Sequence, residues 1–391
     1  MLSIMNPMKI IFPLTIMILA LIFSCTRNVK STKIVDPQAD SLALVALEEA
    51  REDSMDFARS ILLQNQITHS LSADNETAKV EAELEDDAAD DPAIWYNKRN
   101  PADSRILGTN KKAGLYVYDL EGKVLQYSKS GMINNVDVRD GFKYNGKEVA
   151  LVAGSNRSNN SITLFYIDYE TASLSDSIKN IPSGVDEVYG VCMYNDLKKK
   201  EYYVFVNGKG GEMEQWLIKG GNTIEAKLVR AFGLPSQPEG MVASDLTSIL
   251  YLGIEEEGIF SVKANSFKDT LMYKIPESDS TNHNIVYDIE GLAVFNYEGK
   301  EYLIASSQGN FSYALFKLKP ELKYLSSFTL KGSLVDGVEE TDGLDINTHF
   351  FNDNYPSGIL VFQDGYNFDG DSLQSQNFKY LSFEKIIPFL K

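Results

Sequence analysis

The chain has 391 residues, with 55 acidic side chains against 37 basic ones and a formal net charge of −18. This balance argues against nucleic acid or an anionic membrane surface as a partner, because both repel an acidic protein. Two cysteines are present, Cys25 and Cys192, and we do not expect disulfide bonds to hold the fold.

The N-terminus has the pattern of an export signal. Lys9 precedes an apolar run over residues 10–23, which is too short for a membrane-spanning helix, and Ser24-Cys25 closes this run like a bacterial lipoprotein cleavage site. We expect residues 1–24 to be a signal peptide and Cys25 to carry a lipid anchor in the bacterial cell envelope, with the anchor as the membrane contact. The alternative to a lipid-anchored protein is a periplasmic or secreted one.

Residues 25–66 have a different character. Asp40-Ser41 is followed by apolar residues spaced among charges, which resembles a capped amphipathic helix. We expect a partly helical spacer that holds the next domain off a membrane.

From residue 67 to residue 391 one pattern recurs six times, at intervals of about fifty residues. An apolar strand introduced by an acidic or polar residue is followed by a second apolar strand that ends in a polar loop. A third strand with alternating polarity, such as Leu115–Leu120, follows most loops. Six such units predict an all-β fold, a six-bladed β-propeller.

The antiparallel course of the blades predicts where the polar positions meet. Because the second strand returns across the disc, its final loop lies on the face where the first strand begins. The strand starts are Asp91, Asp137, Tyr189, Glu239, Glu290 and Asp342, and the loop residues are Lys111, Arg157, Lys209, Glu255, Gln308 and Asp364.

Carboxylates brought together on this face would repel one another without cations. The converging acidic residues are Asp90, Asp91, Glu239, Glu255, Glu256, Asp288, Glu290, Asp336 and Asp342. Oxygen ligands without clustered histidines or paired cysteines favour Ca²⁺. The acidic run over residues 81–87 is by contrast compatible with a solvated linker.

Three basic residues occupy equivalent loops and indicate an anionic ligand. Lys111, Arg157 and Lys209 would converge on the acidic face, and phosphate suits the planar fork of arginine and the point charge of lysine. Calcium can then bridge an acidic protein to a polyanion.

A series of motifs over residues 67–391 resembles the β-propeller phytases, in order and at matching spacings. The motifs are Asp90-Asp91-Pro92-Ala93-Ile94-Trp95, Thr109-Asn110-Lys111-Lys112, Asn134-Asn135-Val136-Asp137, Ser155-Asn156-Arg157-Ser158, Asp186-Glu187-Val188-Tyr189-Gly190, Gly208-Lys209, Asp288-Ile289-Glu290-Gly291-Leu292, Ser306-Ser307-Gln308-Gly309-Asn310 and Thr341-Asp342-Gly343.

This resemblance implies a calcium-dependent phosphomonoesterase that hydrolyses myo-inositol hexakisphosphate, or phytate, with several structural and catalytic calcium ions. By matching position, the phosphate contacts are Lys111, Arg157, Tyr189 and Lys209. The calcium ligands of the active face include Asp90, Glu239, Glu255, Asp288, Glu290 and Asp342, and a structural calcium site includes Asp336 and Asn367.

We expect a calcium-activated water to attack phosphorus, and Asp90 and Glu255 are both candidates to polarise it. The expected substrate is phytate as its calcium complex, and the expected state is a monomer.

The chain departs from the family pattern at two positions. Gly210 and Ile254 stand where the family commonly has acidic residues, which affects the expected number of calcium ions. Two other functions remain open at this point. A calcium-dependent propeller lactonase shares the fold but does not need the three basic residues, and a non-catalytic phosphate-binding propeller would use calcium for structure alone.

Overall fold

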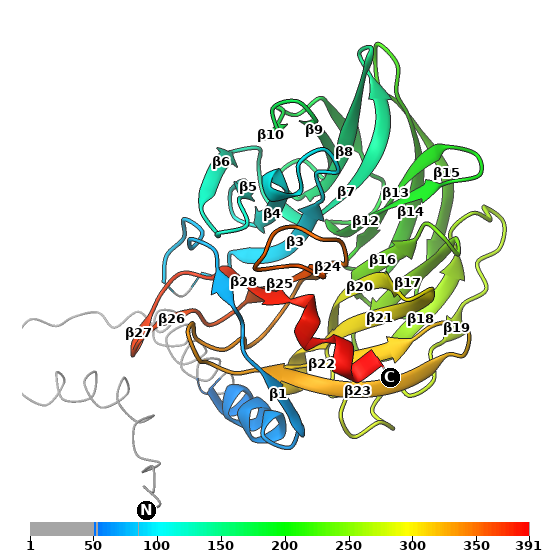
Figure 1. The fold of residues 1–391 in the computed structure, drawn as a ribbon. Coiled ribbons are helices and arrows are strands. Elements are labelled where there is room, and N and C mark those ends of the chain that lie inside the picture. Colours follow the sequence, from blue (N-terminus) through cyan, green and yellow to red (C-terminus); the bar gives the residue numbers. More distant parts are fainter. Residues whose placement is uncertain (1–50, 52–53, 85, 391) are drawn as a thin grey trace, which may run out of the picture. The chain divides into compact units, whose positions relative to one another are not determined.

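The computed structural model describes residues 51, 54–84 and 86–390. Contacts divide the chain into two compact units, Met1–Asp56 and Phe57–Lys391. In the second unit, six sheets surround a central axis as the blades of a propeller (Figure 1). The predicted fold class is therefore confirmed.

Within each blade, consecutive strands pair antiparallel, and the first strand lies innermost. The blades contain, in chain order, β3 (Ala89–Trp95), β4 (Arg105–Asn110), β5 (Gly114–Tyr118) and β6 (Val124–Ser128); β7 (Ile133–Tyr144), β8 (Lys147–Asn156), β9 (Ser161–Asp168), β10 (Ser173–Leu174) and β11 (Lys179–Pro182); β12 (Val188–Asp196), β13 (Glu201–Gly208), β14 (Glu212–Lys219) and β15 (Glu225–Gly233); β16 (Pro238–Ser244), β17 (Ile249–Ile254), β18 (Gly258–Lys263) and β19 (Tyr273–Lys274); β20 (Ile289–Tyr297), β21 (Lys300–Ser307), β22 (Ser312–Lys317) and β23 (Lys323–Leu330); and β24 (Leu344–Asn347), β25 (Ile359–Asp364) and β28 (Asn377–Ser382). Short elements between or after these strands are η1 (Pro101–Asp103), η2 (Gln308–Asn310), the β26 (Phe368–Asp369) and β27 (Ser372–Leu373) hairpin, η3 (Phe383–Lys385) and η4 (Ile387–Leu390).

The start of the second unit supplies the outer strands of the last two blades. β1 (His69–Leu71) pairs in parallel with β23, and β2 (Asn75–Glu76) pairs antiparallel with β28. In Figure 1, β1 lies along β23 although the two are far apart in sequence. The ring of blades is thus closed by hydrogen bonds between the start of the second unit and its last two blades.

A helix over residues 54–64 precedes β1. In the second unit, the Phe57 ring packs against Phe311 and Tyr366, with centroids 5.5 and 4.8 Å apart. The signal peptide and most of the predicted spacer lie outside the described residues, and the predicted domain boundary at residue 67 stays a prediction. Within the described part, no helix is long and apolar enough to cross a membrane.

The hydrophobic core is divided among the interfaces between neighbouring blades. One cluster joins Leu107 and Leu115 of the first blade to Val152 and Phe165 of the second. The remaining interfaces contain equivalent clusters. Because both faces of each sheet are covered in this way, the strands are apolar on both sides, and the polar positions lie at the strand ends.

A β-bulge interrupts the inner strand of five blades at the same place. In each blade two residues oppose one residue of the second strand; these bulge pairs are Asp90-Asp91, Asn134-Asn135, Tyr189-Gly190, Glu239-Gly240 and Glu290-Gly291. Asp342-Gly343 occupies the corresponding place just before β24. A bulge turns its side chains relative to the rest of the strand, so these pairs decide which polar groups face the strand entrance.

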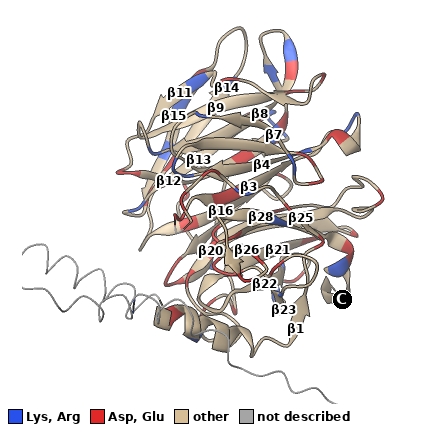
Figure 2. Cartoon of the chain, turned by 90° about the vertical axis from the view of Figure 1, so that its left-hand side faces the viewer, with Lys and Arg blue, Asp and Glu red and all other residues tan. Residues whose placement is uncertain are grey.

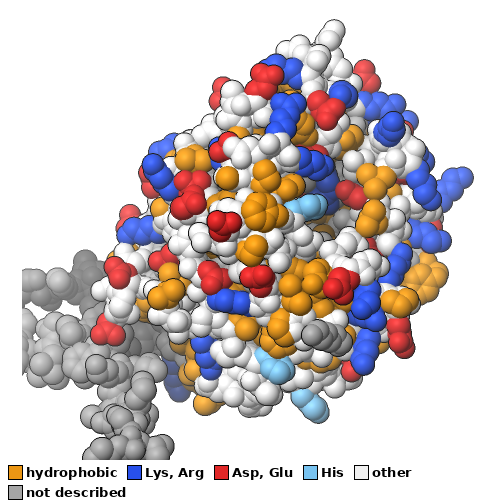
Figure 3. Space-filling view, in the orientation of Figure 1, with side chains coloured by type: hydrophobic (Ala, Val, Ile, Leu, Met, Phe, Trp, Pro, Cys, Tyr) orange, Lys and Arg blue, Asp and Glu red, His pale blue; other side chains and the backbone are white. Residues whose placement is uncertain are grey.

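Charged residues are mixed over the whole propeller. Lys and Arg are interspersed with Asp and Glu along strands and loops (Figure 2), and the face in Figure 3 shows acidic, basic and apolar side chains side by side. Any ligand site must therefore be identified from local geometry.

The glycines of the bulge pairs allow close contact between blades, and this predicts a stability effect. A Cβ atom at Gly240 would overlap the backbone carbonyl of Glu290 in the next blade, whereas a Cβ at Gly233 would meet no atom within 4 Å. We expect Gly240→Ala to lower the free energy of unfolding by about 1–3 kcal/mol, as overpacking does. Denaturant unfolding of Gly240→Ala and of the control Gly233→Ala checks this. An equal effect of the two substitutions would contradict the prediction.

Candidate active site

The first residues of the bulge pairs form a polar ring around the entrance to the central channel. Asp90, Glu239 and Glu290 have exposed fractions of 0%, 6% and 4%, although each carries an ionisable carboxyl group. Asn134 and Tyr189 occupy the equivalent positions of the second and third blades. Burial of several carboxyl groups at one place requires compensating charge.

Lys111 supplies part of this compensation. It follows β4 and its Nζ lies 2.7 Å from Asp87, 2.9 Å from Asp90 and 3.1 Å from Asp342. Burial alone would lower the pKa of Lys111, but the three carboxylates outweigh burial and raise it well above its usual value. Burial raises the pKa of Asp90 to about 6, even though Lys111 opposes that shift. Lys111 is therefore a fixed cation.

A chain of polar contacts runs from Asp90 to the other two cations. Asn134 donates its Nδ2 to Asp90 Oδ2 (3.0 Å) and accepts from Arg157 through Oδ1 (3.4 Å). Arg157 also lies 2.7 Å from Glu187 Oε1, and Lys209 Nζ lies 3.4 Å from the same oxygen. The three predicted cations thus belong to one network across the first three blades.

Tyr189 completes this side of the site. Lys209 Nζ lies 4.9 Å from the centroid of the Tyr189 ring, in a cation–π arrangement. Burial, followed by the charge of Glu239, raises the pKa of the Tyr189 hydroxyl far above its usual value. The hydroxyl therefore stays protonated and can donate a hydrogen bond.

Three glutamates form a candidate metal centre. One carboxylate oxygen from each of Glu239, Glu255 and Glu290 lies within 4.8 Å of the others. Burial raises the pKa of Glu239 to about 7, and burial together with Glu239 raises that of Glu290 well above its usual value. Glu290 Oε2 is buried without a hydrogen-bond partner. A cation at this place would satisfy that oxygen, so the donor set fits a divalent metal with oxygen ligands.

The remaining predicted residues of this face lie around the ring. Asp342 accepts a hydrogen bond from Gln308 Nε2 (2.9 Å) as well as the ion pair from Lys111, and burial raises its pKa well above the usual value. Asp288 directly precedes β20, and burial, then Glu256, raises its pKa. Glu255 accepts from Gln237 Nε2 (2.5 Å). Asp288 and Asp342 thus flank the glutamate centre, to which Glu255 itself belongs.

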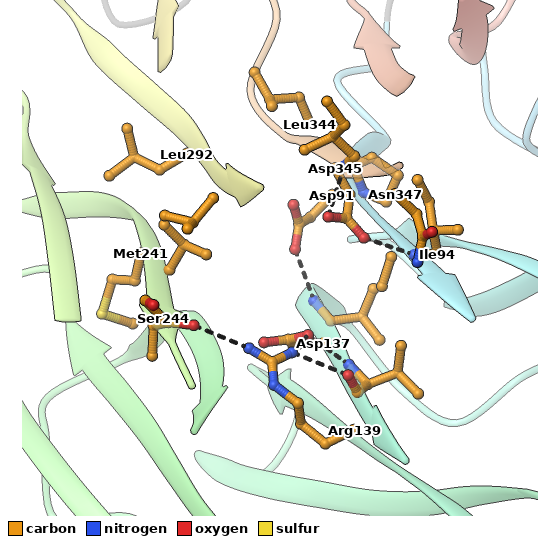
Figure 4. A pocket seen from close by; sticks show the side chains of 18 of the residues that line it. Asp91, Ile94, Asp137, Arg139, Met241, Ser244, Leu292, Leu344, Asp345 and Asn347 are labelled. Atoms are coloured by element: carbon orange, nitrogen blue, oxygen red, sulfur yellow. Dashed lines mark hydrogen bonds and ion pairs between the residues drawn. The ribbon is translucent and has the colours of Figure 1, made fainter. Parts of the chain in front are cut away.

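Asp91 and Asp137 do not belong to this ring. As starts of inner strands, both were expected on the face where the polar positions meet. Both line a pocket of about 280 Å³ deeper in the channel, together with Arg139 and Asp345 (Figure 4). Asp91 accepts from the Val136 backbone (3.0 Å) and Asp137 binds Arg139 (2.6 Å). The reason is the bulge, because Asp91 is the second residue of its pair and Asp137 lies beyond its pair.

Asp336 and Asn367 lie together, but around a lysine. The buried Lys379 Nζ makes ion pairs with Asp336 and Asp364, the latter at 3.2 Å, and lies 3.1 Å from Asn367 Oδ1. Glu76 of β2 also binds this ammonium group. Lys379 already contacts the oxygens of Asp336 and Asn367 that would bind a metal. In this arrangement the two residues do not fit an additional calcium ion. Asp364 consequently belongs to this cluster and not to the ring around the channel.

Three residues of the site were not singled out from the sequence. Asp87 falls in the acidic run that resembled a solvated linker, yet it binds Lys111. Asn134 and Glu187 were visible only as parts of longer motifs. A signal for Asn134 exists in the repeat, since it aligns with Asp90 and Glu239 once the bulge is known.

The departures from the family pattern have local explanations. Ile254 is fully buried in the core between the third and fourth blades. A side chain at Gly210 would contact the Glu212 carboxylate, with a Cβ only 2.8 Å from Oε1. Glu212 thus occupies the space next to Gly210.

The sequence is similar to those of known proteins. A model of the phytase family matches residues 42–391. The chain is 40% identical over 314 residues to a 3-phytase of Bacillus subtilis (strain 168), which covers 78% of this chain and 82% of that protein.

Similarity to solved structures is weaker. A protein from Lactobacillus plantarum has a TM-score of 0.45 at 12% identity, covering 74% of this chain and 87% of that chain. A functionally unknown protein from Desulfotomaculum acetoxidans has a TM-score of 0.40 at 16% identity, covering 59% and 70%. The family match and the Bacillus relative, by contrast, cover most of the chain, and the chain therefore belongs to the phytase family of phosphomonoesterases.

Proposed function

We propose that this propeller hydrolyses phytate with the help of several calcium ions bound at the acidic ring. One observation carries the proposal: two accessible cations, Arg157 and Lys209, lie in the same network as a buried carboxylate ring that lacks enough positive charge of its own. A neutral lactone would not need the two cations, whereas a phosphate monoester does.

Glu239, Glu255 and Glu290 would hold calcium, with Asp288 and Asp342 beside them. When bound, calcium would supply charge neutralisation for the phosphoryl oxygens and would acidify a nearby water. We assign no calcium to Asp336 and Asn367, because Lys379 already binds the oxygens that would serve as calcium ligands.

The residues of the chain supply the remaining parts of the reaction. Arg157 and Lys209 would bind the oxygens of the phosphoryl group, where negative charge must be held in the transition state. Tyr189, protonated at all relevant pH values, would donate a hydrogen bond that orients the group. Lys111 is shielded by three carboxylates and would act mainly by fixing Asp90 and Asp342.

Glu255 is the better of the two candidates to polarise the attacking water. Both oxygens of Asp90 are engaged, one by Lys111 and the other by Asn134. Glu255 is only half-buried and one of its oxygens accepts a bond from Gln237. Its other oxygen, unlike either oxygen of Asp90, is left for calcium and for a water bound beside the ion.

The substrate would arrive as a calcium complex, because the protein and free phytate are both strongly anionic. The direct test is phosphate release from phytate with and without calcium, using p-nitrophenyl phosphate and a lactone for comparison. We expect calcium-dependent release from phytate. Full turnover after exhaustive chelation, verified by metal analysis, would sink the calcium part of the proposal.

Export to the cell envelope is part of the proposal and rests on the sequence of residues 1–25 alone. We expect metabolic labelling with palmitate to tag the protein through Cys25, and Cys25→Ser to abolish the label and release the protein from the membrane fraction. Equal labelling of both forms would contradict the lipid anchor.

Substitution of the cations should separate activity from stability. We expect Arg157→Ala and Lys209→Ala to lower turnover of phytate by roughly ten- to a thousandfold with little loss of stability, since both side chains are partly exposed. Lys111→Met should lower both, because it leaves three carboxylates without their cation, at a cost of about 3–5 kcal/mol. Lys112→Met is the matched control on an exposed neighbour, and equal effects at residues 111 and 112 would refute the assignment.

The raised carboxyl pKa values predict an unusual pH dependence of the calcium-free protein. A carboxyl group whose pKa is higher in the folded state stabilises the fold below its unfolded pKa and loses this contribution as the pH rises. For Glu239 the change spans pH 4.5 to about 7, which corresponds to roughly 3 kcal/mol. In chelator, we expect the melting temperature to fall from pH 5 to pH 8, and calcium to reverse the fall.

Glu239→Gln should flatten this profile, whereas Glu384→Gln, at an exposed position, should not. Calcium binding near pH 6.5 should also release protons, measurable by calorimetry in buffers of different ionisation enthalpy. A calcium-free protein that gains stability over this pH range would show that the buried carboxyl groups titrate differently.

A further inference from the structure

Glu187 is the residue of the site whose position the proposed reaction does not explain. Its Oε1 lies 2.7 Å from Arg157 and 3.4 Å from Lys209, so one carboxylate oxygen contacts both accessible cations. The side chains of Glu187, Arg157 and Lys209 have exposed fractions of 46%, 26% and 39%. Lys111, in contrast, is 9% exposed and engaged by other carboxylates.

The backbone holds Glu187 in this position at a conformational cost. Its φ angle is +49°, in the left-handed region that non-glycine residues rarely adopt. Asn160 fixes both sides of the segment, because it donates to the Val185 carbonyl (2.8 Å) and accepts from the Val188 amide (2.7 Å). Strain retained by such fixed flanks is a sign of a functional constraint.

An anion is thus already present where a phosphoryl group would bind. Without it, Arg157 and Lys209 would repel each other across the same space. With it, the two cations are neutralised and held in place, but an incoming phosphate must compete with the carboxylate and remain beside a negative charge. A ligand with one phosphate is affected most, since it has no second phosphate with which to gain binding energy elsewhere.

We propose that Glu187 is a specificity-determining residue that occupies the phosphate position between Arg157 and Lys209 and must be displaced by substrate. It thereby selects for esters with several phosphates over simple phosphate monoesters. This inference rests on the proposed function, because it takes Arg157 and Lys209 as the phosphate contacts. Glu187 itself is a positioning residue and not a catalytic one.

The test compares Glu187→Gln with wild type at fixed calcium, using inorganic phosphate as the probe. We expect phosphate to bind about three- to tenfold more tightly to the variant in calorimetric titration. The kcat/KM for p-nitrophenyl phosphate should rise by a similar factor, and that for phytate should rise less. The melting temperature should not change, because an exposed ion pair contributes little to stability.

Asp186→Asn is the matched control, since Asp186 is an exposed neighbour that makes no ion pair with any other described residue. It should alter phosphate binding by less than about twofold. Unchanged or weaker phosphate binding in Glu187→Gln would overturn the inference. Weaker binding with a higher calcium requirement would indicate a calcium ligand, which also overturns it. If wild type fails to hydrolyse phytate, the proposed function fails, while the phosphate titration still reports on Glu187.

Discussion

The recurring β-bulge at the start of the inner strands is the constraint on which the site depends. Two residues stand opposite one at the same place in five blades, and the first residue of each pair faces the channel entrance. The freed backbone groups find local partners: the Asp91 amide donates to Thr109 Oγ1 (2.8 Å) and the Asn135 amide to Ser155 Oγ (3.0 Å). A rigid ring of side chains results, each from a different blade.

Close contact between blades follows from the same feature. Gly190, Gly240, Gly291 and Gly343 are the second residues of their pairs, and each lies against the carbonyl of the next blade's bulge. The carboxyl groups of the ring are consequently brought nearer to one another than side chains at that position would permit. Burial, together with their mutual repulsion, raises their pKa values, so the ring as built favours either protons or cations.

The sequence predicted the blades well because the repeat is local. An apolar strand followed by a polar loop identifies a blade wherever it stands, and the six repeats place Lys111, Arg157 and Lys209 at equivalent loops. This pattern does not show a bulge that shifts the strand register by one residue. Asp90 and Asp91 are both acidic, and only the bulge determines which of the two side chains lies in the ring. The prediction therefore grouped Asp91 and Asp137 with Glu239.

The sequence pattern did not predict the contacts between distant segments either. Asp87 precedes the first blade and Lys379 lies near the C-terminus, and their partners come from other parts of the chain. Sequence position alone gave Asp87 the appearance of a solvated residue and Asp336 that of a metal ligand. The difference in each case is made by a lysine whose three-dimensional position no local pattern encodes.

The deeper aspartates show why carboxyl groups in a propeller channel should not be read as one class. Asp345 accepts from the Ile94 amide (2.7 Å), Asp91 from the Val136 amide and Asp137 from the Met193 amide (2.8 Å). Each of these bonds joins an inner strand to that of the next blade. Asp137 also makes an ion pair with Arg139. These carboxylates are thus committed to holding the ring of blades together. Among the described residues, the side chains of Asp90, Glu239 and Glu290, the acidic first residues of their bulge pairs, accept no such bond from a backbone amide of the next blade, and this leaves their charge available to a ligand.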